Sequence, residues 1–481
     1  MFMPQGRGSR PGGSQSLHTS EDPSNDRGVK GGREVEMGTG QTRETKSASV
    51  TVATPAKQAE ETQDRWSWVE PSVWTGPMLA RLQQSEPGTK WFSLWDKVMA
   101  PRNLEAGFWA VWRNSGAPGV DGVTVAQFEA RWPEHIRQLS EELRGGKYQA
   151  APARRQWIPK PGTNEKRPLG IPVVRDRTVQ AALKHVLEPI FEQGFAEQSY
   201  GFRPGRGCRE AVGRVEELLR CGRTVVVDVD LKSYFDTIPH ERLLEQIKRR
   251  IVDGKVLELI RQFLKAGVLE ELRDWEPTET GTPQGGVISP LLSNVYLNEL
   301  DHAMAARGWQ MVRYADDFVV LCPEATQAEA VLNYLREWTA AAGLTLHPTK
   351  TRVVDYGQGE GFDFLGWHFE RNLKWPRQKS QDKFRQSVRE KTPRNAGTSL
   401  KEIITKLNHS LRGWHGYFGA SIKNALRRQD QFIRRRLRAL LRRRAKRPGS
   451  GRTRKDHHLW PNAWFAKRGL FSLEHGSREY S

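Results

Sequence analysis

Two adjacent aspartates, Asp316 and Asp317, lie between two short apolar runs, and this arrangement limits what the surrounding chain can fold into. Residues 311–314 and 318–321 have the composition of β-strands, so the sequence predicts a hairpin with both acids at its turn. Like charges beside buried strands repel each other and lose hydration, which is unfavourable unless a cation or a strong donor offsets the loss. Two explanations stay open here: a solvated turn, since aspartate is common in turns, or a metal site.

A second apolar stretch, residues 223–240, carries acids on a predicted strand. Its alternation divides the side chains between two faces, with Val225, Val227, Val229 and Leu231 on one and Val226, Asp228, Asp230 and Lys232 on the other. A structural ion pair would explain one such aspartate. If this strand lies beside the hairpin in one sheet, Asp230, Asp316 and Asp317 converge, and carboxylate oxygens are the ligands that Mg²⁺ prefers. Two such ions about 4 Å apart promote phosphoryl or nucleotidyl transfer, so the pattern indicates a polymerase or a nuclease.

The charge of the chain points to a polyanionic partner. Its 481 residues carry a formal net charge of +20 and a pI near 10.0, which is typical of proteins that bind nucleic acid or anionic membrane. No apolar run approaches the length of a spanning helix and the N-terminus lacks the apolar core of a signal peptide, so nucleic acid is favoured and no membrane partner is expected. Cys208, Cys221 and Cys322 lack paired metal-ligand spacing. They suit a reducing compartment, and we expect a cytoplasmic, nucleic-acid-associated protein of a bacterial cell.

Residues 426–451 form the most basic part of the chain and have a helical pattern. The apolar side chains on one face of this predicted helix are Ile433, Leu437, Leu440 and Leu441. The arginines that cover the rest of its surface include Arg434, Arg435 and Arg438. We expect the helix to stop at Pro448. A charged face is often merely solvated, but here Asp430 is the one acid, and this favours a surface that contacts phosphates.

Ten motifs follow one another along the chain. They are SGAPGVDG at 115–122, IPKPGTNEKRPLGIP at 158–172, SYGFRPGRGC at 199–208, DLKSYFD at 230–236, GTPQGGVISPLLSNVYL at 281–297, YADD at 314–317, LTLHPTKT at 344–351, FDFLGWHF at 362–369, LNHSLRGWHGYF at 407–418 and PNAWFAKRGLFSL at 461–473. This ordered set resembles the group II intron-encoded reverse transcriptase and maturase family, from about Trp91 to Leu473. The last two motifs resemble the thumb or X region of intron maturases and the tail that follows it.

The resemblance implies a catalytic metal site. Asp230 and Asp316 are expected to bind both catalytic Mg²⁺ ions, for which Mn²⁺ can substitute, while Asp317 assists and the backbone carbonyl of Leu231 completes a site. Many members of the family carry a zinc-dependent HNH endonuclease. No cysteine follows Cys322, so we expect no such domain in this chain.

The resemblance also implies contacts with nucleotide and nucleic acid. Lys160 and Arg167 match residues that hold the incoming triphosphate, which suits an ammonium and a forked guanidinium. Gln284 matches a residue near nucleotide and template, and Phe235 matches an aromatic gate that rejects ribonucleotides. Positions that match elements holding the primer strand are Lys350 and Gly366.

The fold implied by the resemblance is an α+β right-hand polymerase with fingers, a palm with an antiparallel sheet, and a thumb, followed by a helical maturase X region and a short basic C-terminal tail. The expected segments are a disordered tail at 1–63, an N-terminal extension and start of the fingers at 64–150, the fingers and palm of the reverse transcriptase domain at 151–370, the thumb and X region at 371–450, and a basic, DNA-binding-like tail at 451–481.

The function implied by the resemblance is that of an RNA-directed DNA polymerase that copies intron RNA into DNA, and of an RNA-binding maturase that assists group II intron splicing and mobility. Its expected partners are group II intron RNA, an RNA template with a DNA primer or target, and deoxynucleoside triphosphates. Two alternatives stay open: a splicing-only maturase, and an intron-free relative recruited to DNA repair or defence. The oligomeric state also stays open.

Overall fold

The computed structural model describes residues 65–476 except 87, 160–165, 270–278, 283 and 396. The predicted tail at 1–63 and the predicted triphosphate ligand Lys160 therefore lie outside the described residues. Within the described ranges, no helix combines the length and the apolar character that a bilayer crossing requires. Cys208, Cys221 and Cys322 are free thiols.

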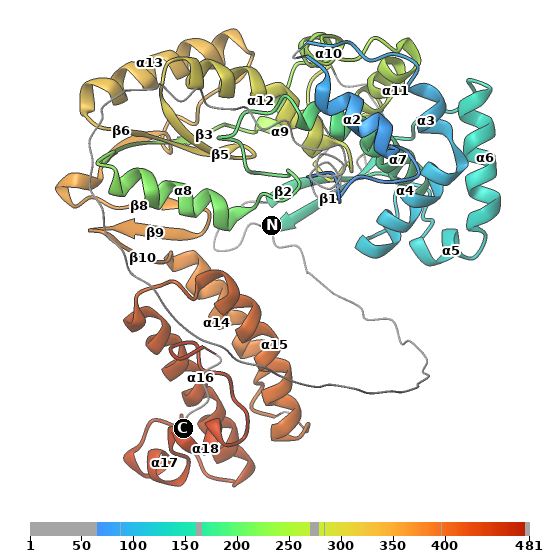
Figure 1. The fold of residues 1–481 in the computed structure, drawn as a ribbon. Helices are drawn as coiled ribbons and strands as arrows, with labels where there is room; N and C mark the ends of the chain where they lie inside the picture. The colour runs from blue at the N-terminus through green and yellow to red at the C-terminus, as the bar shows by residue number, and fades with distance from the viewer. Residues whose placement is uncertain are drawn as a thin grey trace, which may run out of the picture. The chain divides into compact units, whose positions relative to one another are not determined.

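A four-stranded antiparallel sheet, which we call the palm sheet, carries the candidate site (Figure 1). Its strands lie in the order β5 (Gln310–Tyr314), β6 (Asp317–Cys322), β3 (Val225–Asp230) and β7 (Arg352–Asp355). The β5–β6 pair is the hairpin that the apolar runs predict, with the acids at its turn. β3 lies beside β6, so the predicted strand with alternating acids is a direct neighbour of the hairpin.

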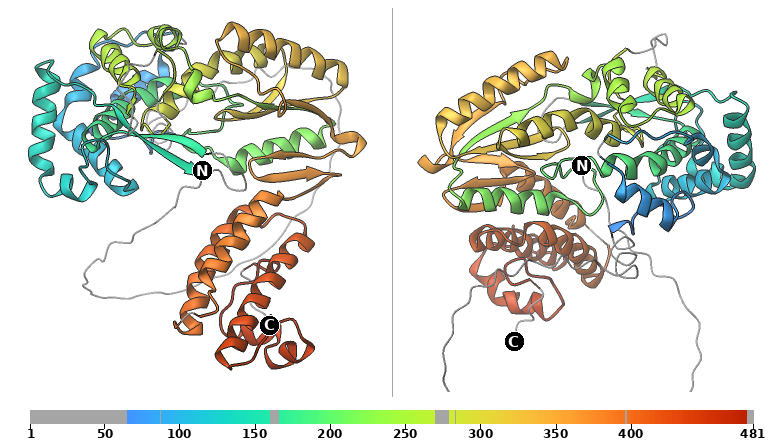
Figure 2. Two further views of the ribbon diagram at one scale, coloured as in Figure 1. Left: turned by 180° about the vertical axis from the view of Figure 1, so that it is seen from behind. Right: turned by 45° about the horizontal axis from the view of Figure 1, so that its top comes forward.

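Each face of the palm sheet packs against different helices because its strands alternate. Val225, Val227 and Val229 enter the larger apolar core, on the side covered by α12 (Ser289–Ala306) and α13 (Ala325–Ala341). Val226 enters a second core with side chains of α8 (Cys208–Arg220). Figure 2 shows α8 on the opposite side of the sheet from α12 and α13. The face assignment predicted from the sequence is confirmed.

The region before the palm sheet is built around α7 (Val174–Glu192), most of whose side chains are buried. α4 (Pro101–Asn114) packs closely on it, because a Cβ at Gly107 would lie 2.7 Å from the carbonyl oxygen of Thr178. A small sheet of β2 (Lys166–Ile171), β1 (Ala153–Pro159) and β4 (Val268–Leu269) lies beside these helices. The other helices of this region and of the palm are α2 (Gly76–Gln84), α3 (Trp95–Met99), α5 (Val125–Glu129), α6 (Trp132–Arg144), α9 (Tyr234–Thr237), α10 (His240–Lys248) and α11 (Gly254–Lys265).

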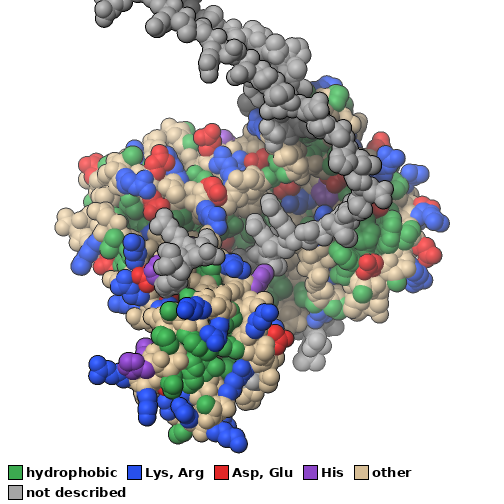
Figure 3. Space-filling model, turned by 60° about the horizontal axis from the view of Figure 1, so that its bottom comes forward, with side chains coloured by type: hydrophobic (Ala, Val, Ile, Leu, Met, Phe, Trp, Pro, Cys, Tyr) green, Lys and Arg blue, Asp and Glu red, His purple; other side chains and the backbone are tan. Residues whose placement is uncertain are grey.

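A three-stranded sheet leads into a helical region that we call the thumb, residues 378–476. The sheet is β8 (Phe362–Phe364), β9 (Trp367–Glu370) and β10 (Leu373–Pro376), and the 3₁₀-helix η1 (Tyr356–Gln358) precedes it. The thumb helices are α14 (Gln378–Lys391), α15 (Leu400–Phe418), α16 (Lys423–Arg444), α17 (Arg454–Leu459) and α18 (Asn462–Ala466). Figure 3 shows that lysine and arginine outnumber acidic side chains on the thumb face turned to the viewer.

One apolar core holds the thumb together. It combines Leu407 of α15 and Leu437 of α16 with Phe465 and Leu473 from the C-terminal segment. The residues that the sequence analysis sets apart as a tail after residue 450 thus pack on the thumb helices.

The basic helix α16 ends earlier than the sequence predicts. We expected it to reach Pro448, but its last residue is Arg444. Lys446 adopts a left-handed conformation, with φ 53°, and the N–H groups of Lys446 and Arg447 donate to the carbonyls of Arg443 and Arg442. This is the Schellman arrangement, which usually has glycine at the left-handed position. Because a lysine at this position does not indicate a helix end, the sequence analysis placed the end of α16 too late.

Candidate active site

The palm sheet brings the predicted acids together at one end of two strands. Asp230, the last residue of β3, is the direct ladder partner of Asp317, the first residue of β6. Direct antiparallel partners project from the same face with Cβ atoms about 4.5–5.5 Å apart. Asp316 precedes Asp317 in the turn, after Ala315, whose φ is 60°. The neighbouring strands that the sequence analysis required are therefore present.

The carboxylates disfavour one another's charge. Burial, and then the charge of Asp230, raise the pKa of Asp316. The Asp317 side chain is partly exposed to solvent. Desolvation by the surrounding protein atoms, followed by the charges of Asp316, Asp228 and Asp230, nevertheless raises its pKa to about 7. Such shifts mean that positive charge supplied to this end of the sheet stabilises the ionised acids.

A lysine already supplies one positive charge. Lys350 Nζ lies 2.8 Å from Asp230 Oδ2, although both side chains are largely exposed. The Lys350 segment is held to the strand end, since the His347 N–H donates to the carbonyl of Asp230 and Leu231 bridges Leu346. The structure therefore places Lys350 and Leu231 at the carboxylate end of β3.

Asp228 belongs to a different contact. It lies 3.5 Å from Arg352 Nε, and burial raises its pKa to about 6. The ion pairing that the sequence analysis left open for one aspartate of this strand is thus present at both of them, with Arg352 at Asp228 and with Lys350 at Asp230.

The donor set fits a hard divalent cation. The converging aspartates offer only oxygen atoms, and burial together with their mutual charges raises the pKa of Asp316 and Asp317. Within the described ranges, no group of three or more His, Cys, Asp or Glu side chains is gathered closely enough to hold an ion. Mg²⁺ commonly binds one or two carboxylates and completes its shell with water and substrate phosphates, so such a cage is not required. Asp230, Asp316 and Asp317 are the residues that would hold the ion.

Three further predicted residues lie around this end of the palm. The charge of Arg167 on β2 lowers the pKa of Asp316, opposing burial. The Gly170 N–H donates to the Gln284 carbonyl at 2.7 Å, and the Thr282 N–H donates to the Phe235 carbonyl at 2.7 Å. These backbone bonds join β2, the segment containing Gln284 and helix α9 into one wall. Phe235 is half-buried within it.

Gly366 joins the hairpin β8–β9 to the thumb. It follows Leu365 in a two-residue turn with φ values of 48° and 87°, and a Cβ there would lie 3.1 Å from Ser380 Oγ. Its carbonyl accepts from Arg377 N and Ser380 Oγ, while Tyr417 Oη donates to the Leu365 carbonyl at 2.9 Å. The structure thus shows a structural requirement for this glycine at the start of the thumb.

The arginines of α16 that were predicted to face phosphates differ in how far they are buried. Arg438 is only 3% exposed and donates to the Trp460 carbonyl and to Asn462 Oδ1, both at 2.9 Å. Arg434 is 9% exposed and lies 3.7 Å from Asp430. The prediction that they cover an open helical surface is wrong, because the C-terminal segment folds back over them. Arg435 is half-buried.

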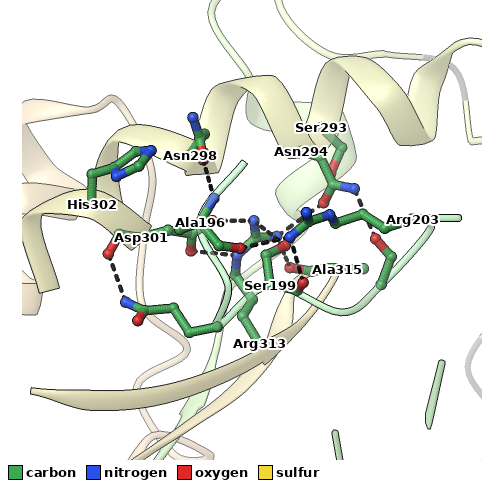
Figure 4. Close-up of polar contacts among 12 residues, drawn as sticks. Ala196, Ser199, Arg203, Ser293, Asn294, Asn298, Asp301, His302, Arg313 and Ala315 are labelled. Carbon is green, nitrogen blue, oxygen red and sulfur yellow. Dashed lines mark hydrogen bonds and ion pairs between the residues drawn. The ribbon is translucent and has the colours of Figure 1, made fainter. Parts of the chain in front are cut away.

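A buried network that the sequence analysis missed holds the turn that carries the acids (Figure 4). Arg313 of β5 is fully buried, donates to Asp301 Oδ1 at 2.7 Å, and forms an ion pair with that carboxylate. It also donates to Asn294 Oδ1 at 3.1 Å, to Ser199 Oγ at 2.8 Å and to the Ala315 carbonyl at 2.9 Å. The bond to the Ala315 carbonyl fixes this left-handed residue, which orients Asp316 and Asp317. The sequence signal for this network was an arginine within an apolar strand.

Two protein families match the chain. The reverse transcriptase (RNA-dependent DNA polymerase) family matches residues 158–369, which include the palm sheet and the acids. The group II intron, maturase-specific domain matches residues 381–460 of the thumb.

Several relatives match over part of their length. Protein YkfC of Escherichia coli (strain K12) is 34% identical in an alignment of 337 positions that covers 62% of this chain and 87% of that protein. The group II intron-encoded protein LtrA of Lactococcus lactis subsp. cremoris is 37% identical in an alignment of 208 positions that covers 43% of this chain and 34% of LtrA. Nuclear intron maturase 2, mitochondrial, of Arabidopsis thaliana is 28% identical in an alignment of 231 positions that covers 40% of this chain and 31% of that protein. The chain thus spans about a third of the length of the last two.

Solved structures show more distant likeness. The telomerase of Candida albicans with a fragment of telomeric RNA has a TM-score of 0.40 and 12% identity, covering 74% of this chain and 67% of that chain. A partial Cas6-RT-Cas1–Cas2 complex has a TM-score of 0.33 and 23% identity, covering 52% and 42%. Similarity at this level carries no argument about function.

We predict that Arg313 positions the acids as well as stabilising the fold. Arg313→Met leaves Asp301 buried and unpaired, which should lower the free energy of unfolding by about 3–5 kcal/mol. Adding Asp301→Leu removes the orphaned charge and should recover most of this loss. The double variant still lacks the donor to Ala315, so it should bind Mn²⁺ more weakly than wild type in an electron paramagnetic resonance titration. Wild-type Mn²⁺ affinity in a stably folded double variant would contradict the positioning role.

We also predict that Asp317→Asn stabilises the metal-free protein at pH 8. Because the folded carboxyl has a pKa of about 7, above its unfolded value of about 3.9, the folded state holds the proton longer and stability falls as the pH rises between these values. The asparagine variant should therefore have the higher Tm at pH 8, a difference that disappears near pH 4. Asp382→Asn, an exposed position on α14, is the matched control. A lower Tm for Asp317→Asn at pH 8 would show that the carboxylate is not destabilised.

Proposed function

This chain belongs to the family of group II intron-encoded reverse transcriptases and maturases, and we propose that it copies RNA into DNA at the site formed by Asp230, Asp316 and Asp317. The observation that carries the proposal is the ladder pairing of Asp230 with Asp317 inside the segment that matches the reverse transcriptase family. Its substrates are then an RNA template, a primer with a free 3′-hydroxyl and deoxynucleoside triphosphates.

The carboxylates hold the reacting groups in line. Divalent ions, when bound, supply the positive charge that activates the primer hydroxyl and neutralises the departing pyrophosphate. Asp230 at the end of β3 and Asp316 in the β5–β6 turn would hold them, with Asp317 and the Leu231 carbonyl assisting. The primer 3′-hydroxyl gives up its proton to water as its oxygen forms a bond to the α-phosphorus, and the bond from this phosphorus to the oxygen that bridges to the β-phosphate breaks, so that pyrophosphate leaves with the electron pair. Lys350 exchanges its ion pair with Asp230 for a contact with the primer strand.

The wall beside the acids binds the incoming nucleotide. Arg167 contacts the triphosphate with its guanidinium fork, aided by Lys160, and Gln284 lies against the base pair being formed. Phe235 closes the position that a 2′-hydroxyl would occupy. The backbone bonds that tie these segments together support this assignment, and so does the charge of Arg167, which lowers the pKa of Asp316.

The thumb provides a second activity on RNA. We propose that it binds the parent group II intron and stabilises the RNA fold that splices. The match of residues 381–460 to the maturase-specific domain and the excess of arginine on α16 support this role. The Gly366 turn would guide the primer strand, and its hydrogen bonds with Ser380 and Tyr417 of the thumb support this role.

The polymerase proposal is tested by Asp230→Asn. We expect RNA-templated primer extension in Mg²⁺ to fall by about 10²–10³-fold or more, the usual result of removing one group that stabilises transition-state charge. RNA affinity should stay within about twofold, since phosphate contacts by basic residues dominate binding. Asp96→Asn, an exposed acid on α3, should extend primers normally. Extension by Asp230→Asn at the wild-type rate would refute the assignment.

Sugar selection is tested by Phe235→Val. A rigid ring that clashes with a 2′-hydroxyl costs about 1–3 kcal/mol, so its removal should raise the relative efficiency of ribonucleotide incorporation by about ten- to a hundredfold. The measurement compares kcat/KM for each nucleotide type on one primer and template. Unchanged selectivity would remove Phe235 from the nucleotide site, and equal loss of both activities would indicate a packing role.

A further inference from the structure

A basic cavity of about 800 Å³ lies in the thumb between α14, α16 and the C-terminal segment. We call it the thumb pocket. The arginines that line it are Arg385, Arg389, Arg427, Arg428, Arg434, Arg435, Arg438 and Arg452, and its one acid is Glu474. Its volume falls in the range of ordinary ligand pockets, about 300–1,000 Å³, but those are mainly apolar. The ligand class indicated here is a polyanion.

Three guanidinium groups surround one phenylalanine ring in the thumb pocket. Arg435 lies 5.2 Å, Arg389 5.4 Å and Arg385 5.8 Å from the centroid of Phe432. Burial, and then the charges of Arg452, Arg385 and Arg389, lower the pKa of Arg435. The ring holds these cations together, but their mutual repulsion remains.

The acids near the thumb pocket are already engaged. Glu474 pairs with Arg427 at 2.7 Å. Asp430 accepts from Ser472 Oγ at 2.8 Å and from Leu473 N at 3.0 Å, as well as lying near Arg434. Among the residues that the structure describes, no carboxylate forms an ion pair with Arg385, Arg389, Arg435 or Arg452. A cluster of like charges without acids is unfavourable in the free protein and favours binding of negative charge.

We propose that the thumb pocket binds adjacent phosphate groups of a sharply bent RNA strand. Guanidinium groups from α14, α16 and the C-terminal segment converge there, and each can hold a phosphate with two parallel hydrogen bonds. RNA is the source of the phosphates because every arginine of the pocket lies within residues 381–460, the match to the maturase-specific domain. The inference rests on the proposed RNA-binding role and adds Arg385, Arg389 and Arg452 to it. Arg438 mainly holds the C-terminal segment in place, and Arg434 lies beside Asp430 of its own helix.

The test compares two variants of the full chain with equal loss of charge. The pocket variant carries Arg→Gln at Arg385, Arg389, Arg435 and Arg452, and the control variant carries Arg→Gln at Arg394, Arg412, Arg443 and Arg468, which are exposed and do not line the cavity. The probe is the chain's own intron RNA or, failing that, a bulged RNA hairpin, titrated by fluorescence anisotropy at several salt concentrations. We expect the slope of log affinity against log salt to shrink by about 0.7 for each lost contact in the pocket variant. The control variant should lose clearly less.

Two further measurements separate RNA binding from other roles. The Tm of the RNA-free pocket variant should equal or exceed that of wild type, because repulsion has been removed, whereas arginines needed for folding would lower it. Primer extension by the wild-type protein on a short oligonucleotide template is measured in parallel, so failure of the polymerase proposal would show separately, as absent extension.

Three outcomes would overturn the inference. Equal losses of slope in both variants would mean that net charge alone matters. A lowered Tm in the pocket variant would make these arginines structural. If inorganic pyrophosphate binds wild type but not the pocket variant while RNA affinity is the same in both, the pocket serves a small polyphosphate rather than RNA.

Discussion

The antiparallel pairing of β3 with β6 is the constraint on which the active site depends. It places Asp230 opposite Asp317 at the ends of two strands whose other residues are apolar and packed on both faces. Packing therefore holds the acids together although their charges oppose this. The buried Arg313–Asp301 pair completes the arrangement, because the same guanidinium that satisfies Asp301 also holds the Ala315 carbonyl in the turn. The side chain of Arg313 thus both stabilises the fold and orients the acids of the turn.

In the part of the chain that the structure describes, like charges gather with incomplete compensation at the end of the palm sheet and in the thumb pocket. The acids at the palm have raised pKa values, and arginines gather around Phe432 in the thumb with their nearest acids already engaged. Both arrangements are unfavourable in the free protein and become favourable when a ligand of opposite charge binds. The palm suits divalent cations and the thumb suits phosphates. A chain that handles RNA needs both, and the hydrogen bond from Tyr417 to the Leu365 carbonyl links the two regions mechanically.

Local patterns predicted the palm well and the thumb less well. Alternation was enough to locate β3, β5 and β6 and to assign the faces of β3, since strand periodicity is a local property. The end of α16 depended on Lys446 in a left-handed conformation, which composition does not reveal. The burial of Arg438 depended on a segment more than twenty residues later folding back on the helix. The role of Arg313 likewise arose from contacts with Ser199 and Asp301, which only the fold brings together.

The central claim is that the paired ends of β3 and β6 hold divalent metal for nucleotidyl transfer. It is tested most directly by anomalous scattering from crystals of the protein with an RNA template, a DNA primer, a non-hydrolysable deoxynucleoside triphosphate and Mn²⁺. The account predicts metal peaks within about 2.5 Å of carboxylate oxygens of Asp230 and Asp316, with the nucleotide phosphates completing the shell. A nucleotide bound in the palm with no metal peak at these aspartates, or with its metal held by other residues, would contradict the account.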